Sequence, residues 1–285
     1  MSLPSIDNRS CWQWFSRLIN GVILLDLLLL SRSFWAVFGS RGFINEELMA
    51  QSDAPFTIWP LLERVPNISG ETALTALLLA NVLLACAGIR FGPRRGLSVI
   101  QYAVYLCFIQ SISLGIYGMH EFLKIALFYL MISSFFFKGE GGEPPVFLGT
   151  AIRAHLAVAY CAAGISKSLG IAWWSGDSVW RAVQRHDMSH WALINLSTVA
   201  VPTWIYVGAA WTTILTETFY PLAFFRKLTP IFVIVMSCMH LGTIIFQGLY
   251  LFGTTMIVFN MFFFFHSRAS LPREAAIVLE PAQIQ

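Results

Sequence analysis

Residues 153–167 read RAHLAVAYCAAGISK and set basic, aromatic and small side chains into an otherwise apolar run. Four of these residues follow one another at intervals of 7, 4 and 3 positions: Arg153, Tyr160, Gly164 and Lys167. An α-helix carries residues at such intervals on one face. Glycine on that face lets a neighbouring backbone come close. The stretch therefore predicts a membrane helix that packs its polar face against other helices.

The composition of the 285-residue chain points to the same environment. Apolar side chains make up 57% of it and charged side chains 12%, and the mean hydropathy is +0.68. Soluble domains carry about 25% charged residues. These values exclude a disordered chain, a soluble two-domain enzyme and a disulfide-rich secreted module. The net charge of +3 gives no basic surface for nucleic acid, so no nucleic-acid partner is expected.

Eight apolar runs are long enough to be membrane helices, since a span needs roughly 20 residues. They cover residues 15–32, 72–89, 97–117, 121–137, 147–164, 199–225, 230–250 and 251–266. The last two runs are nearly continuous, and we place their boundary near residues 248–253. We predict an all-α fold, a polytopic integral membrane bundle of about eight transmembrane helices plus amphipathic helices on the outer side.

Lysine and arginine counts predict the orientation, because short cytoplasmic loops are rich in both. With eight spans, ten of these residues fall on one side and four on the other. Both termini should therefore be cytoplasmic. We expect the membrane to be that of a bacterial cell. The chain is expected to be one membrane domain over residues 1–285, with its membrane part at about 12–266 and a short cytoplasmic tail at 267–285. The outer segment 165–198 should form one or two amphipathic helices that turn near residues 185–187.

Ionisable residues within the spans are candidates for a functional site, because charge is costly inside a membrane. Nine such residues occur: Asp26, His120, Glu121, Lys124, Arg153, His155, Lys167, Glu217 and His240. A second interpretation is that some of them pair with each other and hold the bundle together. The sequence alone leaves both interpretations open.

Three of these residues have a specific chemical interpretation. A desolvated Lys167 can lose its proton and act as a base, which arginine cannot do; the alternative is an ordinary lysine reaching the interface at a helix end. His120 can transfer a proton near neutral pH or serve as a polar cap. His240 can bind a ligand or form a hydrogen bond between helices.

A metal site has little support in the sequence. His186 and His190 are four residues apart, which is half of a metal site on a helix. No third ligand stands at a useful spacing, whereas a catalytic zinc site needs three protein ligands. We therefore predict no metal.

The motif Tyr160-x-x-Ala163-Gly164-Ile165-Ser166-Lys167, followed by Trp173-x-x-Gly176, resembles the catalytic segment of vitamin K-dependent gamma-carboxylase and the wider HTTM (carboxylase-like transmembrane) family. Weaker matches to the family occur over about residues 12–266, in the order in which the family has them. They comprise Arg17, Gly21, Asp26, residues 119–123 around His120, Arg153, Glu217 with Pro221, and Met239-His240.

This resemblance implies a function. The family's mechanism implies a neutral lysine, here Lys167, that takes a proton from a reduced quinone, a vitamin K-like hydroquinone. The quinol then reacts with O2 to become a strong base, and CO2 adds to a glutamate carbon of a bound peptide. By the same resemblance His120 assists at the peptide carbanion, and His240 lines the quinone pocket. Glu217, Tyr160, Arg153 and Trp173 are its further expected substrate- or quinone-binding residues.

The chain also resembles short members of this family in length, such as the protein that matures a sporulation-delaying toxin. That similarity implies an alternative function without carboxylation. Under this alternative the protein matures, exports or gives immunity to a secreted peptide toxin, and it acts with a small partner protein. Membrane lipid is an expected partner under both interpretations.

Overall fold

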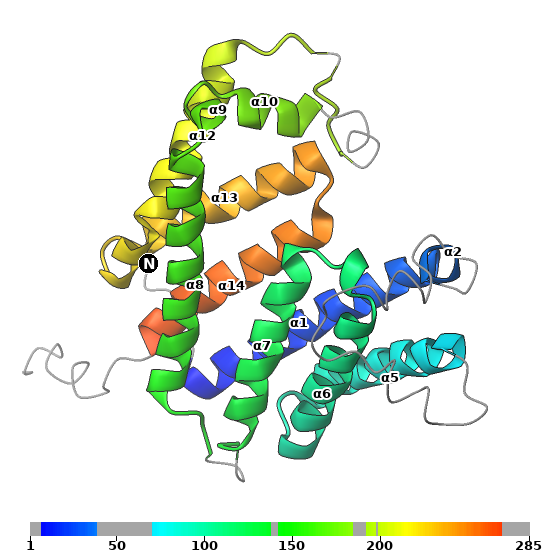
Figure 1. The fold of residues 1–285 in the computed structure, drawn as a ribbon. Helices are drawn as coiled ribbons and strands as arrows, with labels where there is room; N and C mark the ends of the chain where they lie inside the picture. Colours follow the sequence, from blue (N-terminus) through cyan, green and yellow to red (C-terminus); the bar gives the residue numbers. More distant parts are fainter. Residues whose placement is uncertain (1–6, 39–69, 138–141, 185–191, 198, 270–285) are drawn as a thin grey trace, which may run out of the picture. The chain divides into compact units, whose positions relative to one another are not determined.

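The computed structural model describes residues 7–38, 70–137, 142–184, 192–197 and 199–269. These residues form α-helices and short 3-10 helices, and none of them lies in a strand (Figure 1). Within the described residues, five helices are long and apolar enough to cross a membrane: α1 (Asn8–Ser31), α5 (Gly70–Phe91), α8 (Val146–Ser168), α13 (Thr229–Gln247) and α14 (Tyr250–Ala269). They indicate an integral membrane protein, as the composition predicts.

The other three predicted spans coincide with shorter helices, namely α6 (Arg95–Ser111), α7 (Gly118–Ser134) and α12 (Thr203–Thr218). Helices of 16 and 17 residues reach only about 25 Å, against roughly 30 Å of hydrocarbon. Eight membrane crossings therefore stay a prediction, although each of the eight runs is helical.

The predicted span at 199–225 is too long. Helix α12 begins after Pro202 and ends at Thr218, and the 3-10 helix η2 (Tyr220–Phe224) follows with Pro221 at its start. Proline lacks the N–H that would continue the α-helical hydrogen bonds and favours the first turn of a new helix. The two prolines therefore set the length of α12.

Apolar side chains on the outside of the spans fit a lipid environment. Only 22% of the hydrophobic window of α13 and 28% of that of α5 are buried inside the protein. Exposed residues include Leu83, at 70%, and Ile234, at 60%. Soluble proteins rarely expose contiguous apolar faces of this kind. These faces are available to lipid chains.

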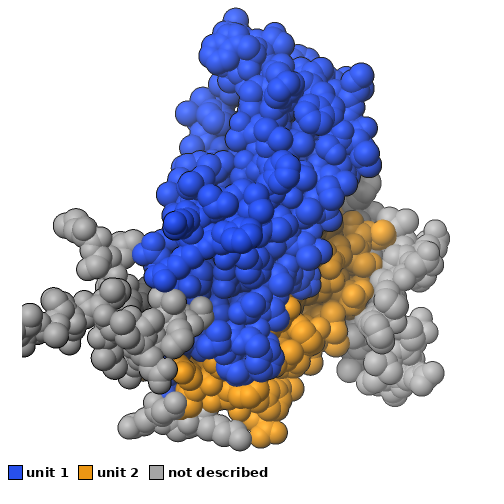
Figure 2. Space-filling model, turned by 90° about the vertical axis from the view of Figure 1, so that its left-hand side faces the viewer, with its two compact units in different colours: residues 1–11, 145–250, 259–285 blue, residues 12–144, 251–258 orange. Residues whose placement is uncertain are grey.

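The chain divides into two compact units, coloured separately in Figure 2. The first comprises residues 1–11, 145–250 and 259–285, and the second comprises residues 12–144 and 251–258. Each unit is described by its own contacts.

The second unit is built on α1, α5, α6 and α7, with the short helices α2 (Phe34–Phe38) and η1 (Ser113–Gly115). Helix α5 packs on α6, and α6 packs on α7. A buried polar contact joins three of these helices, since Gln101 of α6 donates a hydrogen bond to Asn20 of α1, and the Asn20 side chain lies directly against Gly88 of α5. Any larger residue at position 88 would overlap Asn20.

The first unit is organised around α8, which packs mainly on α12. Two short helices follow α8, namely α9 (Ile171–Trp174) and α10 (Asp177–Gln184). Their presence agrees with the helices expected in the segment 165–198, while the predicted turn near residues 185–187 lies outside the described residues. Gly176 has a φ of 79°, and a Cβ there would stand 2.6 Å from the backbone nitrogen of Val207. This close contact holds the start of α10 against α12.

The boundary between α13 and α14 lies at Gly248, within the predicted range. Gly248 has a φ of 68° and a ψ of 16°, the left-handed conformation, and its N–H donates to the carbonyl of Ile244 at 3.3 Å. Helices often end on a glycine in this conformation, because glycine has no Cβ to clash with the backbone.

Replacing Gly248 with alanine should lower the free energy of unfolding by about 1 kcal/mol, because an L-residue is strained in the left-handed region. The matched control is Gly242→Ala in the same helix, where a Cβ meets no atom within 4 Å. Thermal unfolding of the purified protein in detergent measures both. Equal midpoints for the two variants would contradict the role assigned to Gly248.

Candidate functional site

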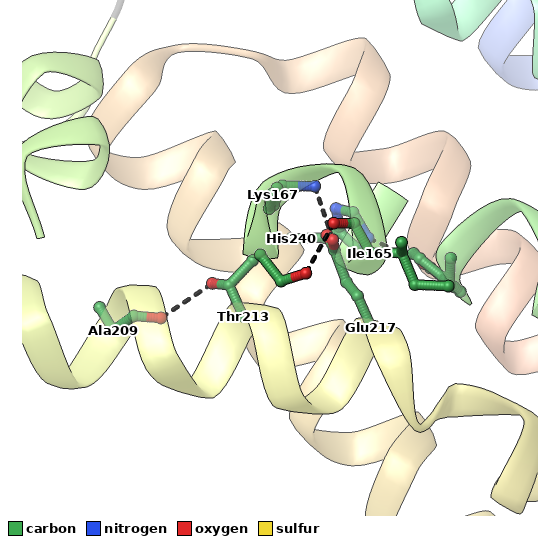
Figure 3. Close-up of polar contacts among 8 residues, drawn as sticks. Ile165, Lys167, Ala209, Thr213, Glu217 and His240 are labelled. Carbon is green, nitrogen blue, oxygen red and sulfur yellow. Dashed lines mark hydrogen bonds and ion pairs between the residues drawn. The ribbon is translucent and has the colours of Figure 1, made fainter. Parts of the chain in front are cut away.

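A cluster of polar side chains lies within the first unit, where α8 meets α12 and α13. The predicted face of α8 is its packed face: Arg153, Tyr160 and Gly164 are buried, and Lys167 is partly buried. Lys167 stands in the last turn of α8, and Glu217 stands in the last turn of α12. Figure 3 shows Lys167, Glu217 and His240 gathered at one place.

The central contact is an ion pair. The Nζ atom of Lys167 lies 2.5 Å from Oε2 of Glu217, and the two side chains are 22% and 9% exposed. The ring centre of Trp173 on α9 lies 5.3 Å from the same Nζ. Aromatic rings attract cations through their electron-rich faces. Two predicted residues of the motif at 160–176 and a third from α12 therefore meet here.

A second polar contact extends the cluster into the unit. The hydroxyl of Tyr160 lies 2.8 Å from Nε2 of His240, and Asn260 Nδ2 donates to the same hydroxyl at 2.9 Å. The hydroxyl of Tyr220 in turn donates to Asn260 Oδ1 at 2.7 Å. All four residues are buried. They form a continuous chain of hydrogen bonds through α8, α13, α14 and η2.

Two members of this chain, Asn260 and Tyr220, are absent from the predicted site. Asn260 interrupts the apolar run of α14, and polar residues within membrane helices often bond to neighbouring helices. That interruption is a usable signal in the sequence. Tyr220 gives no such signal, because tyrosine is common at membrane interfaces.

Gly164 makes the ion pair geometrically possible. A Cβ at this position would overlap the backbone nitrogen and the hydroxyl of Thr218, and it would lie 2.9 Å from the carbonyl carbon of Glu217. The backbones of α8 and α12 therefore touch one turn of α8 before Lys167. This agrees with the close approach that the sequence predicts for Gly164.

Arg153 occupies the same face of α8 but belongs to a different neighbourhood. It precedes Lys167 by 14 positions, which corresponds to about 21 Å along a helix. Its guanidinium carbon lies 4.7 Å from the ring centre of Phe224 and 4.4 Å from that of Phe263. The structure does not bring Arg153 to the ion pair, and its predicted role in quinone or substrate binding stays a prediction.

His120 belongs to the second unit. Its Nδ1 accepts a hydrogen bond from the backbone N–H of Tyr117 at 3.1 Å, and its Nε2 lies 3.3 Å from Oδ2 of Asp26. The side chain thus caps the start of α7, which is the polar-cap interpretation of the sequence. Its predicted assistance at a carbanion stays a prediction.

Close contacts between an acidic and a basic side chain account for most of the ionisable candidates. Six of the nine form three pairs: Asp26 with His120, Glu121 with Lys124, and Lys167 with Glu217. His240 bonds to Tyr160 of another helix, as its interhelical interpretation predicts. Of these three acid–base contacts, Lys167–Glu217 is the one that lies in the polar cluster of the first unit.

The predicted half-site for a metal, His186 and His190, lies outside the described residues. Among the residues that the structure describes, no three His, Cys, Asp or Glu side chains come together as metal ligands would. The polar cluster itself offers one amine, one carboxylate, one imidazole, one carboxamide and two phenols. Such groups bind and move protons and donate hydrogen bonds to ligand oxygens.

No protein-family model, no curated protein and no solved structure matches the chain. Membership of the carboxylase-like family therefore rests on the motifs alone and stays a prediction.

Gly164→Ala should destabilise the first unit by about 1–3 kcal/mol, since the new methyl group forces α8 and α12 apart. The matched control is Gly208→Ala in α12, where a Cβ meets no atom within 4 Å. Alanine should be neutral or stabilising there, because it favours the helix over glycine. Thermal unfolding in detergent distinguishes the two, and a Gly164→Ala protein as stable as the control would refute the close contact.

Proposed function

We propose that the protein is an integral membrane enzyme that uses a reduced quinone to modify a peptide or small substrate at the outer membrane face. One observation carries the proposal: a lysine and a glutamate paired at 2.5 Å inside an apolar helical unit, beside an indole ring. The resemblance of the segment around Lys167 to the carboxylase family supplies the reaction class.

The donor set of the cluster suits a quinone. A quinone has an aromatic-like ring and two ring oxygens, which accept hydrogen bonds. Lys167, Tyr160 and His240 are the residues that would bond to those oxygens, and Trp173 would cover a ring face. A bound hydroquinone supplies two electrons and two hydroxyl protons. The apolar outer surfaces of the helices leave the unit in contact with the phase in which quinones dissolve.

The ion pair gives Lys167 a route to the neutral form that a base requires. Nζ can accept a proton only after it has released one, and Oε2 of Glu217 stands within hydrogen-bond distance to receive it. A proton transfer within the pair leaves an amine and a carboxylic acid, so no net charge is created inside the membrane. Glu217 thus acts as the proton acceptor for Lys167 in this proposal.

The hydrogen-bonded chain His240–Tyr160–Asn260–Tyr220 would fix the position of the reacting group and exclude water. The Tyr160 hydroxyl accepts from Asn260, so its own proton remains available for His240 or for a ligand. Because each partner fixes the next, the imidazole of His240 is held in one orientation. Preorganised donors of this kind stabilise charge more effectively than mobile ones.

We also propose that both termini lie in the cytoplasm of a bacterial cell, which would place Lys167 near the outer face. The support is the excess of lysine and arginine on one side of the predicted spans. A fluorescent-protein fusion at residue 285 should fluoresce, because this reporter folds in the cytoplasm. An alkaline phosphatase fusion at the same place should be inactive, and the reverse pair of results would invert the topology.

Replacing Lys167 with arginine should abolish turnover while the protein still folds, because arginine keeps the ion pair but cannot act as a base. Membrane vesicles containing the protein are supplied with reduced phylloquinone, and quinol oxidation is followed by oxygen uptake. We expect a loss of about 100-fold or more, the usual contribution of general acid–base catalysis. The control is Lys227→Arg, an exposed lysine of the same unit.

Two results would contradict the proposal. A wild-type rate in Lys167→Arg would show that position 167 needs only a positive charge. The second result concerns quinone binding. Mass spectrometry of the lipids extracted from the purified protein measures it. Absence of any quinone from the wild-type extract, together with no uptake of added phylloquinone, would remove the quinone from the proposal.

A further inference from the structure

The buried cation of Arg153 has no ionic partner among the described residues. Arg153 is 7% exposed, its Nε atom has no hydrogen-bond acceptor, and no described carboxylate pairs with it. The rings of Phe224 and Phe263 attract the charge but accept no ordinary hydrogen bond. An uncompensated cation inside a membrane protein is costly and is a candidate site for a ligand.

His266 on α14 is a second orphaned polar group at the same place. It is fully buried, and neither ring nitrogen has a hydrogen-bond partner among the described residues. The imidazole stacks on Phe262 and lies directly against Gly149 of α8, one turn before Arg153. Phe263, which contacts Arg153, is in turn one helical turn before His266. Helices α8 and α14 therefore each place a polar group without a hydrogen-bond partner in the described part of the chain at the same location.

The position of this location along its two helices indicates the class of ligand. Arg153 stands seven residues into α8, about 10 Å from its first residue, and side chains on a helix lean toward its N-terminus. His266 stands three residues before the end of α14. The Arg153 side chain thus leans toward the near end of α8, and His266 meets it from the last turns of α14. Both groups lie in the parts of their helices closest to the boundary between lipid phosphates and hydrocarbon. Basic pockets between membrane helices bind phosphate-containing headgroups in this position.

We propose that Arg153 and His266 form a phosphate-binding site, filled by the headgroup of an anionic lipid or by a phosphate from the aqueous phase. The guanidinium offers five N–H donors in a planar fork that matches two phosphate oxygens, and the imidazole adds one further donor. Binding would satisfy both orphaned groups and neutralise the buried charge. The proposal does not depend on the function of the Lys167–Glu217 pair.

The test measures thermal unfolding of the delipidated full-length protein in detergent with three matched probes. Dioleoylphosphatidylglycerol carries a phosphate, dioleoylglycerol has the same chains without one, and inorganic phosphate is compared with chloride at equal ionic strength. A ligand that binds only the folded state raises the midpoint in a saturable way. We expect stabilisation by the phospholipid or by inorganic phosphate, and none by dioleoylglycerol. Stabilisation by phospholipid alone identifies the lipid as the source, and stabilisation by inorganic phosphate identifies the aqueous phase.

Variants assign the effect to the site. Arg153→Gln should weaken the apparent affinity by about tenfold or more, since a bidentate charged contact is lost. Arg181→Gln is the control, because Arg181 is an exposed arginine of the same unit that pairs with Asp177. If Arg153→Gln does not fold, Arg153→Lys takes its place, which keeps the charge but loses the planar fork. Equal responses to phospholipid and dioleoylglycerol, or an unchanged affinity in the Arg153 variant that folds, would overturn the proposal.

Discussion

The ion pair between Lys167 and Glu217 is the constraint on which the first unit depends. Burying one charge within a membrane helix is expensive, and breaking a buried pair by removing one partner costs about 3–5 kcal/mol. The pair is possible only because Gly164 lets α8 and α12 touch just before their charged residues. A glycine, a lysine and a glutamate from two helices therefore act as one structural element, and Tyr160 and His240 are positioned beside it.

The second unit follows the same rule with neutral groups. Gly88 gives room to the side chain of Asn20, which accepts a hydrogen bond from Gln101. In lipid the hydrophobic effect gives little drive for helices to associate, so close packing at small residues and hydrogen bonds between helices must supply it. Both units thus combine a glycine contact with a polar contact at a helix crossing. At the Gly164 crossing the polar contact is a lysine–glutamate ion pair, whereas at the Gly88 crossing it is a hydrogen bond between two neutral amides.

The sequence predicts the helices better than their contacts. Every apolar run became a helix, because a membrane span must satisfy its own backbone hydrogen bonds. Helix α12 is shorter than its apolar run because Pro202 and Pro221 limit it. The prediction was too long because hydropathy does not register the effect of proline on a helix. The polar face of α8 followed from its helical spacing.

The partners of that face could not be derived in the same way. Lys167 and Glu217 are 50 positions apart, and their meeting depends on which helices pack together. Periodicity describes one helix at a time and carries no information on this choice. Asn260 illustrates the same limit. A lone polar residue in an apolar run indicates that it has a hydrogen-bond partner but does not show which residue that partner is. Its bonds to Tyr160 and Tyr220 require the tertiary structure.

The pairing also changes how Lys167 must be understood chemically. An isolated lysine in an apolar site would be a base because burial disfavours its charge. Lys167 is not isolated, and its carboxylate partner supports the ammonium form unless the proton moves to Glu217 within the pair. A role of Lys167 as a base and its ion pair with Glu217 are therefore compatible. The same 2.5 Å contact that makes the buried charge tolerable would, in the proposed reaction, also provide the acceptor through which Lys167 becomes neutral. Under that proposal a substitution at Glu217 affects folding and proton transfer together.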